Sequence, residues 1–350
     1  MSEAKKSKQV QKSGDSSLNI QAGQISIGPT YQDVKAIALE VFKSNFAQLS
    51  DIAMDTAQTR AEEITNQFLD ELMKKNPQGL KSAKEPAFQY ALFTVQKEYA
   101  KSGDKDLGSV LVDILVDRTK EVNRNLMQIV LNESLETAPK LTSNQYATLS
   151  VIFLLKYTRY LRMINFNEFS QYYGRMISPF VPELVKENAC YQHLEYAGCG
   201  TIGIGSRSIE DILLKTYPIL FVKPFNKEEV SDLLSQEPKL SAIISPSPKD
   251  PSLVKPLITE ESIMREFSLQ MSIEASLIDK LLEIMKKHAM NSHEAKDYSI
   301  TAHPCMTILY DFWGNSFMKN MTLTSVGIAI AHANIRRITG NQFDLSIWIK

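Results

Sequence analysis

The chain is poor in cysteine, has no long apolar run and carries almost no net charge. Three cysteines in 350 residues make an odd and sparse set, which does not suit a disulfide framework. The most apolar run, Ala147 to Leu155, is too short to span a bilayer and is closed by Lys156. The 39 basic and 40 acidic residues leave a net charge of −1, which argues against a generally basic surface for nucleic acid.

The first residues also lack the apolar segment of a secretory signal. Residues 1–17 are instead polar and include Lys5, Lys6, Lys8 and Lys12, so we expect a disordered tail. Four lysines alone do not establish a role at a nucleic acid or a membrane surface. Together with the sparse cysteines, this start predicts a cytoplasmic protein without a membrane span.

Residues 18–28 form a short segment in which apolar and polar residues alternate, as in a β-strand. A single strand leaves its backbone donors and acceptors unpaired on both sides. It must therefore add to a sheet elsewhere in the chain or pair with a second copy. The second option makes the protein a homo-oligomer. The candidate self-association residues in this segment are Leu18, Ile20, Ile25 and Ile27.

Residues 31–75 contain neither proline nor glycine and have apolar residues at helical spacing. They predict one helix roughly 65 Å long, at about 1.5 Å per residue, which ends before Pro77 and Gly79. Its large apolar side chains exceed what an isolated surface helix needs. Phe42 and Phe46 are therefore further candidates for self-association, with packing inside the chain as the equal alternative.

The rest of the chain predicts a mainly α fold of multi-helix domains with a few short strands. We place an N-terminal helical region at 29–140 and a C-terminal, mostly helical region at 141–350. The prolines between 237 and 257 indicate a long loop. Helices are expected at 85–101, 107–136, 145–163, 260–290, 300–312 and 323–338, and strands at 217–222 and 343–349.

Residues 317–350 match the outline of a winged-helix-like unit, with a strand, a helix behind Thr324 and a last strand. Such units read DNA through a basic helix in the major groove. This helix offers only Arg336 and Arg337 beside His332, too few cations for strong neutralisation of phosphates. We therefore favour a packing or protein-contact role over a nucleic-acid partner.

The segment 198–205 is the glycine-densest stretch of the chain and the candidate ligand site. Its glycines include a G-x-G-x-x-G spacing, and a helix is expected after them. The buried strand and the alternating β–α pattern of a dinucleotide-binding unit are missing. A structural turn is therefore favoured over a ligand loop, and no cofactor is favoured. The candidate ligand-binding residues are Gly198, Gly200, Gly203, Gly205 and Arg207.

Metal binding and catalysis find little support in the sequence. Cys190, His193 and Cys199 lie close together, but a structural zinc site needs a fourth ligand. His303 and Cys305 supply one only through a long-range contact, so buried, apolar cysteines are favoured. Neighbouring carboxylates on a helix diverge by about 100°, and no nucleophile elbow is present. We find no catalytic motif, so the sequence favours a protein without enzymatic activity.

Several segments resemble an uncharacterised family of bacterial proteins. They are the Asn-Ile-Gln-Ala-Gly element at 19–23, the helix start at 31–35 and the segments 141–145, 153–155, 196–200 and 343–349. The resemblance covers nearly the whole chain from Asn19 and implies no activity, cofactor or catalytic residue. Similar N-terminal elements occur in bacterial conflict and phage-defence proteins, which implies a stress-response role by association.

Two functions are compatible with these patterns. The first is a cytoplasmic interaction protein that self-associates through the segment 18–28 and the helix that follows, or that binds another protein. The alternative is a ligand- or nucleotide-responsive sensor or enzyme that uses the glycine segment 198–205. The residues themselves identify no substrate and no partner.

Overall fold

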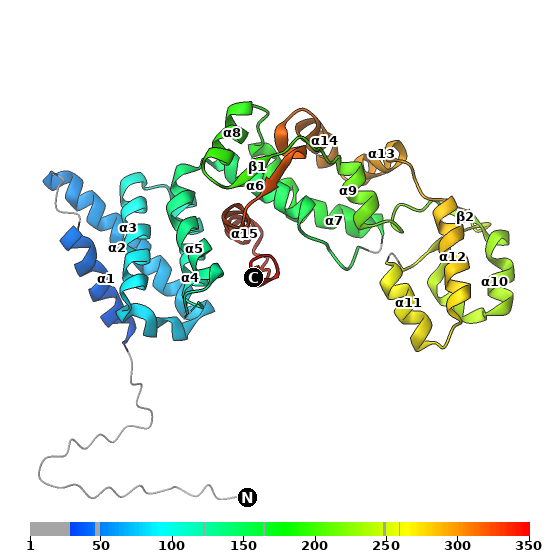
Figure 1. The fold of residues 1–350 in the computed structure, drawn as a ribbon, viewed down its shortest axis with the longest axis horizontal. Helices are drawn as coiled ribbons and strands as arrows, with labels where there is room; N and C mark the ends of the chain where they lie inside the picture. Colours follow the sequence, from blue (N-terminus) through cyan, green and yellow to red (C-terminus); the bar gives the residue numbers. More distant parts are fainter. Residues whose placement is uncertain (1–28, 46–49, 122, 164, 248–249, 259) are drawn as a thin grey trace, which may run out of the picture.

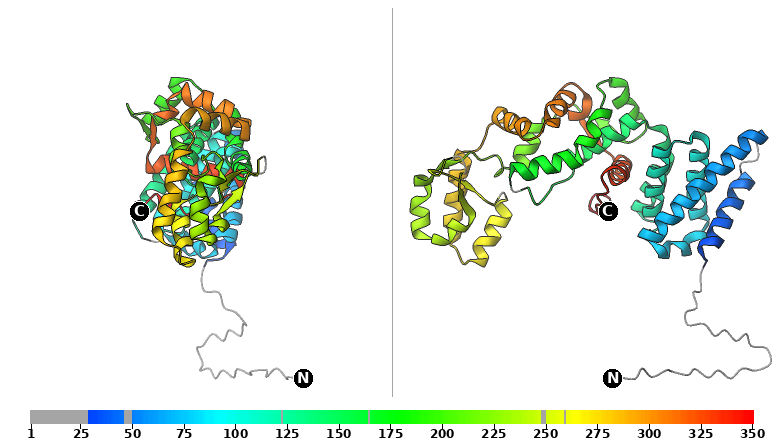
Figure 2. Two further views of the ribbon diagram at one scale, coloured as in Figure 1. Left: turned by 90° about the vertical axis from the view of Figure 1, so that its right-hand side faces the viewer. Right: turned by 180° about the vertical axis from the view of Figure 1, so that it is seen from behind.

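The computed structural model describes residues 29–45, 50–121, 123–163, 165–247, 250–258 and 260–350. These residues form a mainly α protein, as the sequence predicts, with strands confined to two small antiparallel sheets. The helices follow one another along an elongated molecule, from an N-terminal bundle through a central region to a separate unit at the far end (Figure 1). The view from behind shows the same succession (Figure 2).

The described part of the N-terminal bundle consists of α1 to α5, packed through their apolar faces (Figure 1). Proline opens the third helix at Pro86, as predicted, and Gly103 in a left-handed conformation (φ 63°) ends it. The bounds are α1 Tyr31–Asn45, α2 Asp51–Lys75, α3 Pro86–Ser102, α4 Lys105–Arg118 and α5 Leu126–Thr137, with 3-10 helices at Pro77–Lys84 and Ala138–Lys140.

The long helix predicted at the start of the chain is two helices, α1 and α2. They pack side by side (Figure 1), and Lys35 Nζ lies 2.8 Å from Glu62 Oε1 across them. Phe42 on α1 belongs to the same buried cluster as Ala57 and Ala61 on α2, whose small side chains permit close approach. The prediction of a single helix is therefore wrong. The chain reverses direction between α1 and α2, and the apolar faces of the two helices pack against each other.

The helix predicted over 107–136 is also two helices, α4 and α5. Near the end of α4, Arg118 Nη1 donates to the carbonyl oxygen of Glu121, and the helix stops. α5 begins behind Asn125, whose side chain accepts a hydrogen bond from Gln128 N. This N-cap lies inside a stretch with continuous apolar periodicity, which is why the period alone predicted one helix.

The helices α6 and α15 pack together in the central region, and α15 also contacts α4 and α5. α15 therefore joins the central region to the bundle. The helix predicted over 145–163 is shorter, since α6 ends at Lys156, and the helix predicted over 300–312 is interrupted at Pro304. The bounds are α6 Ser143–Lys156, α7 Phe166–Met176, α8 Asn188–Tyr196, α9 Ile209–Thr216, α13 Ser292–Ala302, α14 Cys305–Gly314 and α15 Ser325–Thr339, with 3-10 helices at Ser178–Glu183, Phe317–Lys319 and Leu345–Ile347.

One small sheet joins segments that are far apart in the sequence. Strand β1 (Gly200–Ile202) pairs antiparallel with β5 (Met321–Leu323), and Thr201 lies opposite Thr322. The glycine segment thus lies against the chain just before α15. The sequence predicted neither this pairing nor its register.

Residues 219–288 form a unit with its own apolar core. The chain enters and leaves it at adjacent points, because Met290 N donates to Phe221 O at 2.8 Å and Lys223 N donates to His288 O at 2.9 Å. The unit is therefore an insertion into the central region. Its elements are β2 Phe225–Asn226, α10 Ser231–Gln236, β3 Ile244–Pro246, β4 Leu253–Pro256, α11 Glu261–Gln270 and α12 Ala275–Lys287, with 3-10 helices at Lys227–Val230 and Pro238–Ile243 and the sheet order β2–β4–β3.

The inserted unit corrects three predictions. The proline-rich stretch 237–257 is not one loop, since it contains a 3-10 helix and the strands β3 and β4, with prolines at strand ends where the ladder tolerates them. The helix predicted over 260–290 is divided into α11 and α12. The strand predicted over 217–222 contributes only an isolated bridge between Val222 and Ala289.

The strand predicted over 343–349 is not formed. Leu345 and Ile349 are buried instead, Ile347 is exposed, and Phe343 and Trp348 pack edge-on against Phe153 of α6. Because β5 pairs with β1 and a last strand is missing from the described C-terminal residues, the winged-helix-like unit predicted over 317–350 is not present.

Candidate functional site

Backbone hydrogen bonds hold the glycine segment 198–205 against the chain ahead of α15. Gly203 N donates to Asn320 O at 3.1 Å, and Thr324 N donates to Cys199 O at 3.1 Å. A phosphate-binding loop would direct such amides at its ligand. Here the amide of Gly203 is already bonded within the chain, which fits the structural turn that the sequence favoured.

The predicted ligand-binding residues differ in their surroundings. An added Cβ at Gly200, in β1, would lie 2.9 Å from Thr322 O, so this position needs glycine for strand pairing. Gly198 has a left-handed conformation (φ 75°), while a Cβ at Gly205 would meet no described atom within 4 Å. Arg207 is exposed. Ligand binding by these residues remains a prediction.

Lys156 anchors the chain next to the glycine segment through backbone carbonyl groups. Its Nζ donates to Met318 O at 2.9 Å, to Lys319 O at 3.0 Å and to Met321 O at 2.8 Å. The same ammonium group lies 5.2 Å from the ring centroid of Trp313, within range of a cation–π contact. Burial lowers the pKa of Lys156 to about 8. These contacts tie the end of α6 to β5.

The candidate metal ligands do not form a metal site. Gln145 Nε2 lies 2.9 Å from His193 Nδ1, so a neighbouring amide occupies one ring nitrogen of His193, and it also donates to the backbone carbonyl oxygen of Cys190 at 3.0 Å. Burial raises the pKa of Cys190 to about 11 and that of Cys199 to about 12, which keeps both thiols protonated. Among the described residues, no group of three or more His, Cys, Asp or Glu side chains is placed to hold a metal ion.

A buried charge cluster joins α4 to α15. Arg336 Nη2 lies 2.9 Å from Asp117 Oδ2, and Arg336 Nε lies 3.1 Å from Asp113 Oδ1. Burial by itself raises the pKa of Asp117, but Arg336 and Lys120 outweigh burial and hold this pKa below its usual value. The pair is therefore ionised at neutral pH, at a position where Arg336 is 7% exposed.

A cavity of about 380 Å³ lies beside this cluster, between α4, α5, α15 and residues 342–346. His332, which is 2% exposed, lines it. His332 Nε2 lies 2.9 Å from Phe343 O and donates to it, because a carbonyl oxygen can only accept. Within the described part of the chain, Nδ1 has no hydrogen-bond partner, and Asp117 Oδ2 is 4.0 Å away. The lining residues are Asp117, Lys120, Glu121, Met127, Leu131, His332, Gln342, Phe343, Asp344, Leu345 and Ser346.

The sequence contains an overlooked signal for this charge cluster. Asp113 and Asp117 are four residues apart in the largely apolar stretch 110–117, and His332 and Arg336 are four residues apart in a helix whose preceding residues 326–331 are apolar. Ionisable side chains are rarely buried unless they are paired. The spacing puts each pair on one helical face, but only the tertiary structure shows that the two faces meet.

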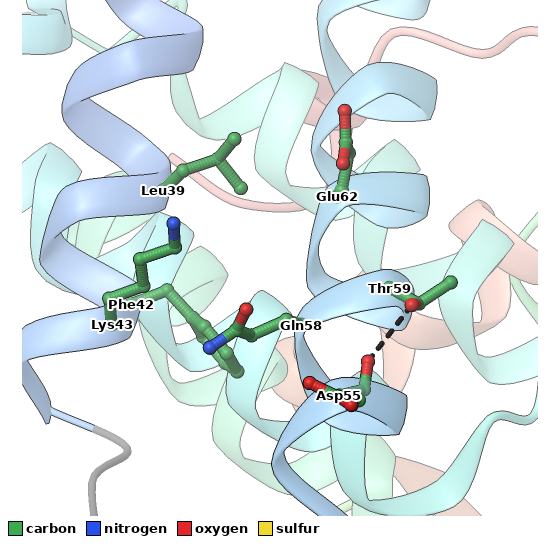
Figure 3. A pocket seen from close by; sticks show the side chains of 7 residues that line it. All are labelled: Leu39, Phe42, Lys43, Asp55, Gln58, Thr59 and Glu62. Atoms are coloured by element: carbon green, nitrogen blue, oxygen red, sulfur yellow. Dashed lines mark hydrogen bonds between the residues drawn. The ribbon is translucent and has the colours of Figure 1, made fainter. Parts of the chain in front are cut away.

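A second, smaller groove of about 280 Å³ lies between α1 and α2. Figure 3 shows Leu39 and Lys43 of α1 on one side and Gln58 and Glu62 of α2 on the other. Phe42, which closes the floor between them, is 1% exposed. Its side chain is therefore used in packing within the chain, and the prediction that α1 presents it to a second copy does not hold.

The other predicted self-association residues lie outside the described residues. These are Leu18, Ile20, Ile25, Ile27 and Phe46.

Bundle, central region and inserted unit together define a multi-helix protein of the mainly α class. A family model matches residues 28–349, so the chain belongs to this family, which is uncharacterised. The element at 19–23 lies outside the matched range. No curated protein and no solved structure matches the chain. In the part of the chain that the structure describes, every helix is too short or too polar to cross a membrane.

Proposed function

We propose that the protein is a cytoplasmic interaction protein that self-associates through residues 18–28. One observation carries this proposal. The alternating segment leads directly into α1, the outermost helix of the bundle, at one end of an elongated molecule (Figure 1). A strand at this end can pair with the same strand of a second copy without displacing the packing of α1 to α5.

Apolar side chains of α1 and α2 are also partly exposed. Ile37 and Val41 lie toward α3, Leu39 lies toward α2, and Ile52 at the start of α2 is 83% exposed. Burial stabilises by about 25 cal/mol per Å² of apolar surface. Covering about 200 Å² of such surface would thus add roughly 5 kcal/mol to an association that the strand begins.

The resemblance of the element at 19–23 to elements of bacterial conflict and phage-defence proteins supports a role in a stress response. The stress-response role is inferred only from this resemblance, so it is less well supported than self-association.

The mass of the full chain in solution, compared with that of a chain beginning at Gly28, tests self-association. Light scattering over a hundredfold range of concentration should give at least twice the single-chain mass for the full chain and the single-chain mass for the shortened one. The removed residues precede the described structure and the family match, so the shortened chain keeps every described residue and the whole matched range.

A pair of charge-matched variants sharpens this test. Ile20→Asp with Ile25→Asp places two charges on apolar positions of the alternating segment, and we expect it to be monomeric. Asn19→Asp with Ser26→Asp adds the same charge at polar positions and should remain associated. A single-chain mass for the unaltered protein at every concentration would refute the proposal.

The alternative function is a ligand- or nucleotide-responsive protein that uses the glycine segment. Substitutions in and next to that segment test it. Gly200→Val is unsuitable because the new side chain collides with Thr322 O across the strand pair. Arg207→Ala and Gly205→Ala leave the strands intact, since Arg207 is exposed and Gly205 has open space beside it in the described structure. Equal thermal stabilisation of the parent and both variants by nucleotides would exclude this segment as the ligand site.

A further inference from the structure

We propose that a cavity at the end of α4 binds a small polar molecule that carries a phosphate monoester group. The cavity has a volume of about 660 Å³ and lies between the 3-10 helix Pro77–Lys84, the start of α3, the end of α4 and the start of α5. None of its lining residues belongs to the glycine segment 198–205 or to residues 18–28. The proposal therefore stands independently of both functions considered above.

The first argument is a buried arginine that has no carboxylate partner. Arg118, the last residue of α4, lines the cavity and is 4% exposed. Its hydrogen bonds run to neutral oxygens, from Nε to Asn132 Oδ1 at 2.9 Å and from Nη1 to Glu121 O at 3.3 Å, and no described carboxylate forms an ion pair with it. Arg336 is buried to a similar degree, but it faces two aspartates. A buried cation is costly unless an anion compensates it.

The second argument is that Arg118 keeps donors that a ligand can reach. A guanidinium has five N–H groups, and two of them donate within the described structure, which leaves three. Nη2 donates to no described residue, yet it is not one of the fully enclosed side-chain atoms that lack a partner. Nη2 therefore remains in contact with solvent. Because Arg118 lines the cavity, an anion there can accept hydrogen bonds from it.

The third argument is a second cation without an anion. Lys81 of the 3-10 helix also lines the cavity, is exposed and forms no ion pair with a described carboxylate. The remaining lysine of the lining, Lys120, is already engaged, since its Nζ lies 2.7 Å from Asp117 Oδ1. Arg118 and Lys81 thus supply two uncompensated positive charges. A phosphate monoester carries between about 1.5 and 2 negative charges at pH 7 and matches them better than a carboxylate, which carries one.

The other polar groups of the lining are compatible with this ligand. Glu121 Oε2 accepts a hydrogen bond from Asn125 Nδ2 at 2.6 Å, and Glu85 is exposed, so that water and salt screen its charge. Gln78 and Ser82 contribute an amide and a hydroxyl group whose side chains form no hydrogen bond with another described residue. These two groups can bond to hydroxyl groups on the body of the ligand.

The packing of the chain itself fixes the walls of the cavity. Asn76 Nδ2 donates to Thr119 Oγ1 at 2.9 Å, directly next to Arg118. An added Cβ at Gly79 would lie 2.9 Å from the same Thr119 oxygen, so the 3-10 helix packs closely against the end of α4. The volume falls in the usual range for small-molecule sites, about 300–1,000 Å³. A preformed site of this size binds its ligand without a large cost for ordering.

Three probes with the same body and different charge test the proposal on the full-length protein. Isothermal titration calorimetry is performed at pH 7.5 and constant ionic strength with glycerol 3-phosphate, glycerate and glycerol. We expect saturable one-to-one binding of the phosphate, at least tenfold weaker binding of the carboxylate and no binding of glycerol. No saturable binding of glycerol 3-phosphate at millimolar concentration overturns the proposal, as does equal binding of glycerate. This series needs no variant and so does not depend on the folding of one.

Variants then locate the site. Lys81→Gln removes one of the two uncompensated charges and should bind glycerol 3-phosphate at least threefold more weakly. The matched control is Lys84→Gln, which alters an exposed lysine of the same 3-10 helix that does not line the cavity and should keep the parent affinity.

Arg118→Gln removes the buried cation and should abolish saturable binding. If this variant does not fold, the comparison of Lys81→Gln with Lys84→Gln still locates the phosphate. The parent affinity in Lys81→Gln, or in a folded Arg118→Gln protein, would place the phosphate elsewhere and overturn the proposal.

Discussion

Individual residues in this protein are constrained most strongly where one backbone passes close to another. Gly327, in the first turn of α15, is such a position, because an added Cβ would lie 1.9 Å from Cys199 O. Cys199 precedes β1, and its carbonyl accepts from Thr324 N, so neither backbone can move away without breaking this bond. The need for glycine here comes from close approach and not from a left-handed φ.

Gly327→Ala should therefore destabilise the protein by about 1–3 kcal/mol, the usual cost of overpacking. The control is Gly314→Ala at the end of α14, where a Cβ meets no described atom within 4 Å. It should be neutral or more stable by up to about 1 kcal/mol, because alanine favours a helix over glycine. Urea unfolding of the two variants measures the difference, and equal stabilities would contradict the close contact at Gly327.

His332 makes stability depend on pH. The pKa of His332 in the folded protein lies below its ordinary value of 6.5. Between these two pKa values, His332 binds a proton in the unfolded chain but stays neutral in the folded protein. The folded state is thus fully favoured above about pH 6.5 and loses stability as the pH falls toward the folded pKa. His332→Gln should lack this part of the pH dependence. Urea unfolding of both proteins between pH 7.5 and 5 tests it, and parallel curves would argue against a buried neutral imidazole.

At the scale of elements, α1 and α2 show how one periodic stretch becomes a helical pair. Phe42 supplies the large side chain between them, and alanines on α2 leave room for it. The structure thus assigns to the interior of the chain an apolar residue that the sequence also allowed at an interface between copies. A Phe42 inside one chain stabilises the protein equally at every protein concentration, whereas a Phe42 at an interface between copies stabilises it more at higher concentration.

Phe42→Ala should lower the free energy of unfolding by about 3–5 kcal/mol, as for other buried phenylalanines. The loss should be the same at 1 and 50 μM protein, because the contact lies within one chain. Lys43→Ala, at the next and exposed position, is the control and should change stability by less than about 0.5 kcal/mol. A loss that grows with concentration would place Phe42 at an interface after all.

For the whole molecule, the junction between bundle and central region contains two buried ion pairs that share Arg336. Arg336 of α15 meets Asp113 and Asp117 of α4, whereas its neighbour Arg337 pairs with the exposed carboxylate of Asp106. The two arginines are adjacent in the sequence, but Arg336 forms buried ion pairs and Arg337 forms an ion pair with an exposed carboxylate. Without Arg336, Asp113 keeps Lys75 at 2.8 Å and Asp117 keeps Lys120 at 2.7 Å, but both buried carboxylates lose their buried cation. An exposed pair contributes little.

Arg336→Met should therefore lower the free energy of unfolding by more than about 1 kcal/mol, and Arg337→Met by less than about 1 kcal/mol. The cost of Arg336→Met should shrink in acid. The arginine lowers the folded pKa of Asp117, so the parent loses this stabilisation as the pH falls below the ordinary value of 3.8. Unfolding curves at pH 7 and pH 3 test both statements, and equal costs for the two arginines would remove the ion pair from the account of the junction.

What the sequence determined by itself are the local properties of the chain. Apolar spacing predicted a mainly α protein, and Pro86 and Asn76-Pro77 marked helix boundaries that the structure contains. These features are local because a helix closes its hydrogen bonds within four residues and a proline acts on its own turn. The sequence favoured a structural turn at 198–205, but residues 200–202 form β1, and neither this strand nor its partner was predicted.

The tertiary structure decided where the helices divide, which strands pair and which charges are buried. The split between α1 and α2, the β1–β5 ladder and the contact of Arg336 with Asp117 each join residues that are distant in the sequence. Periodicity shows that a helix has an apolar or a charged face. How much that face contributes to the stability of the fold depends on the surface that packs against it. That surface exists only once the chain has folded.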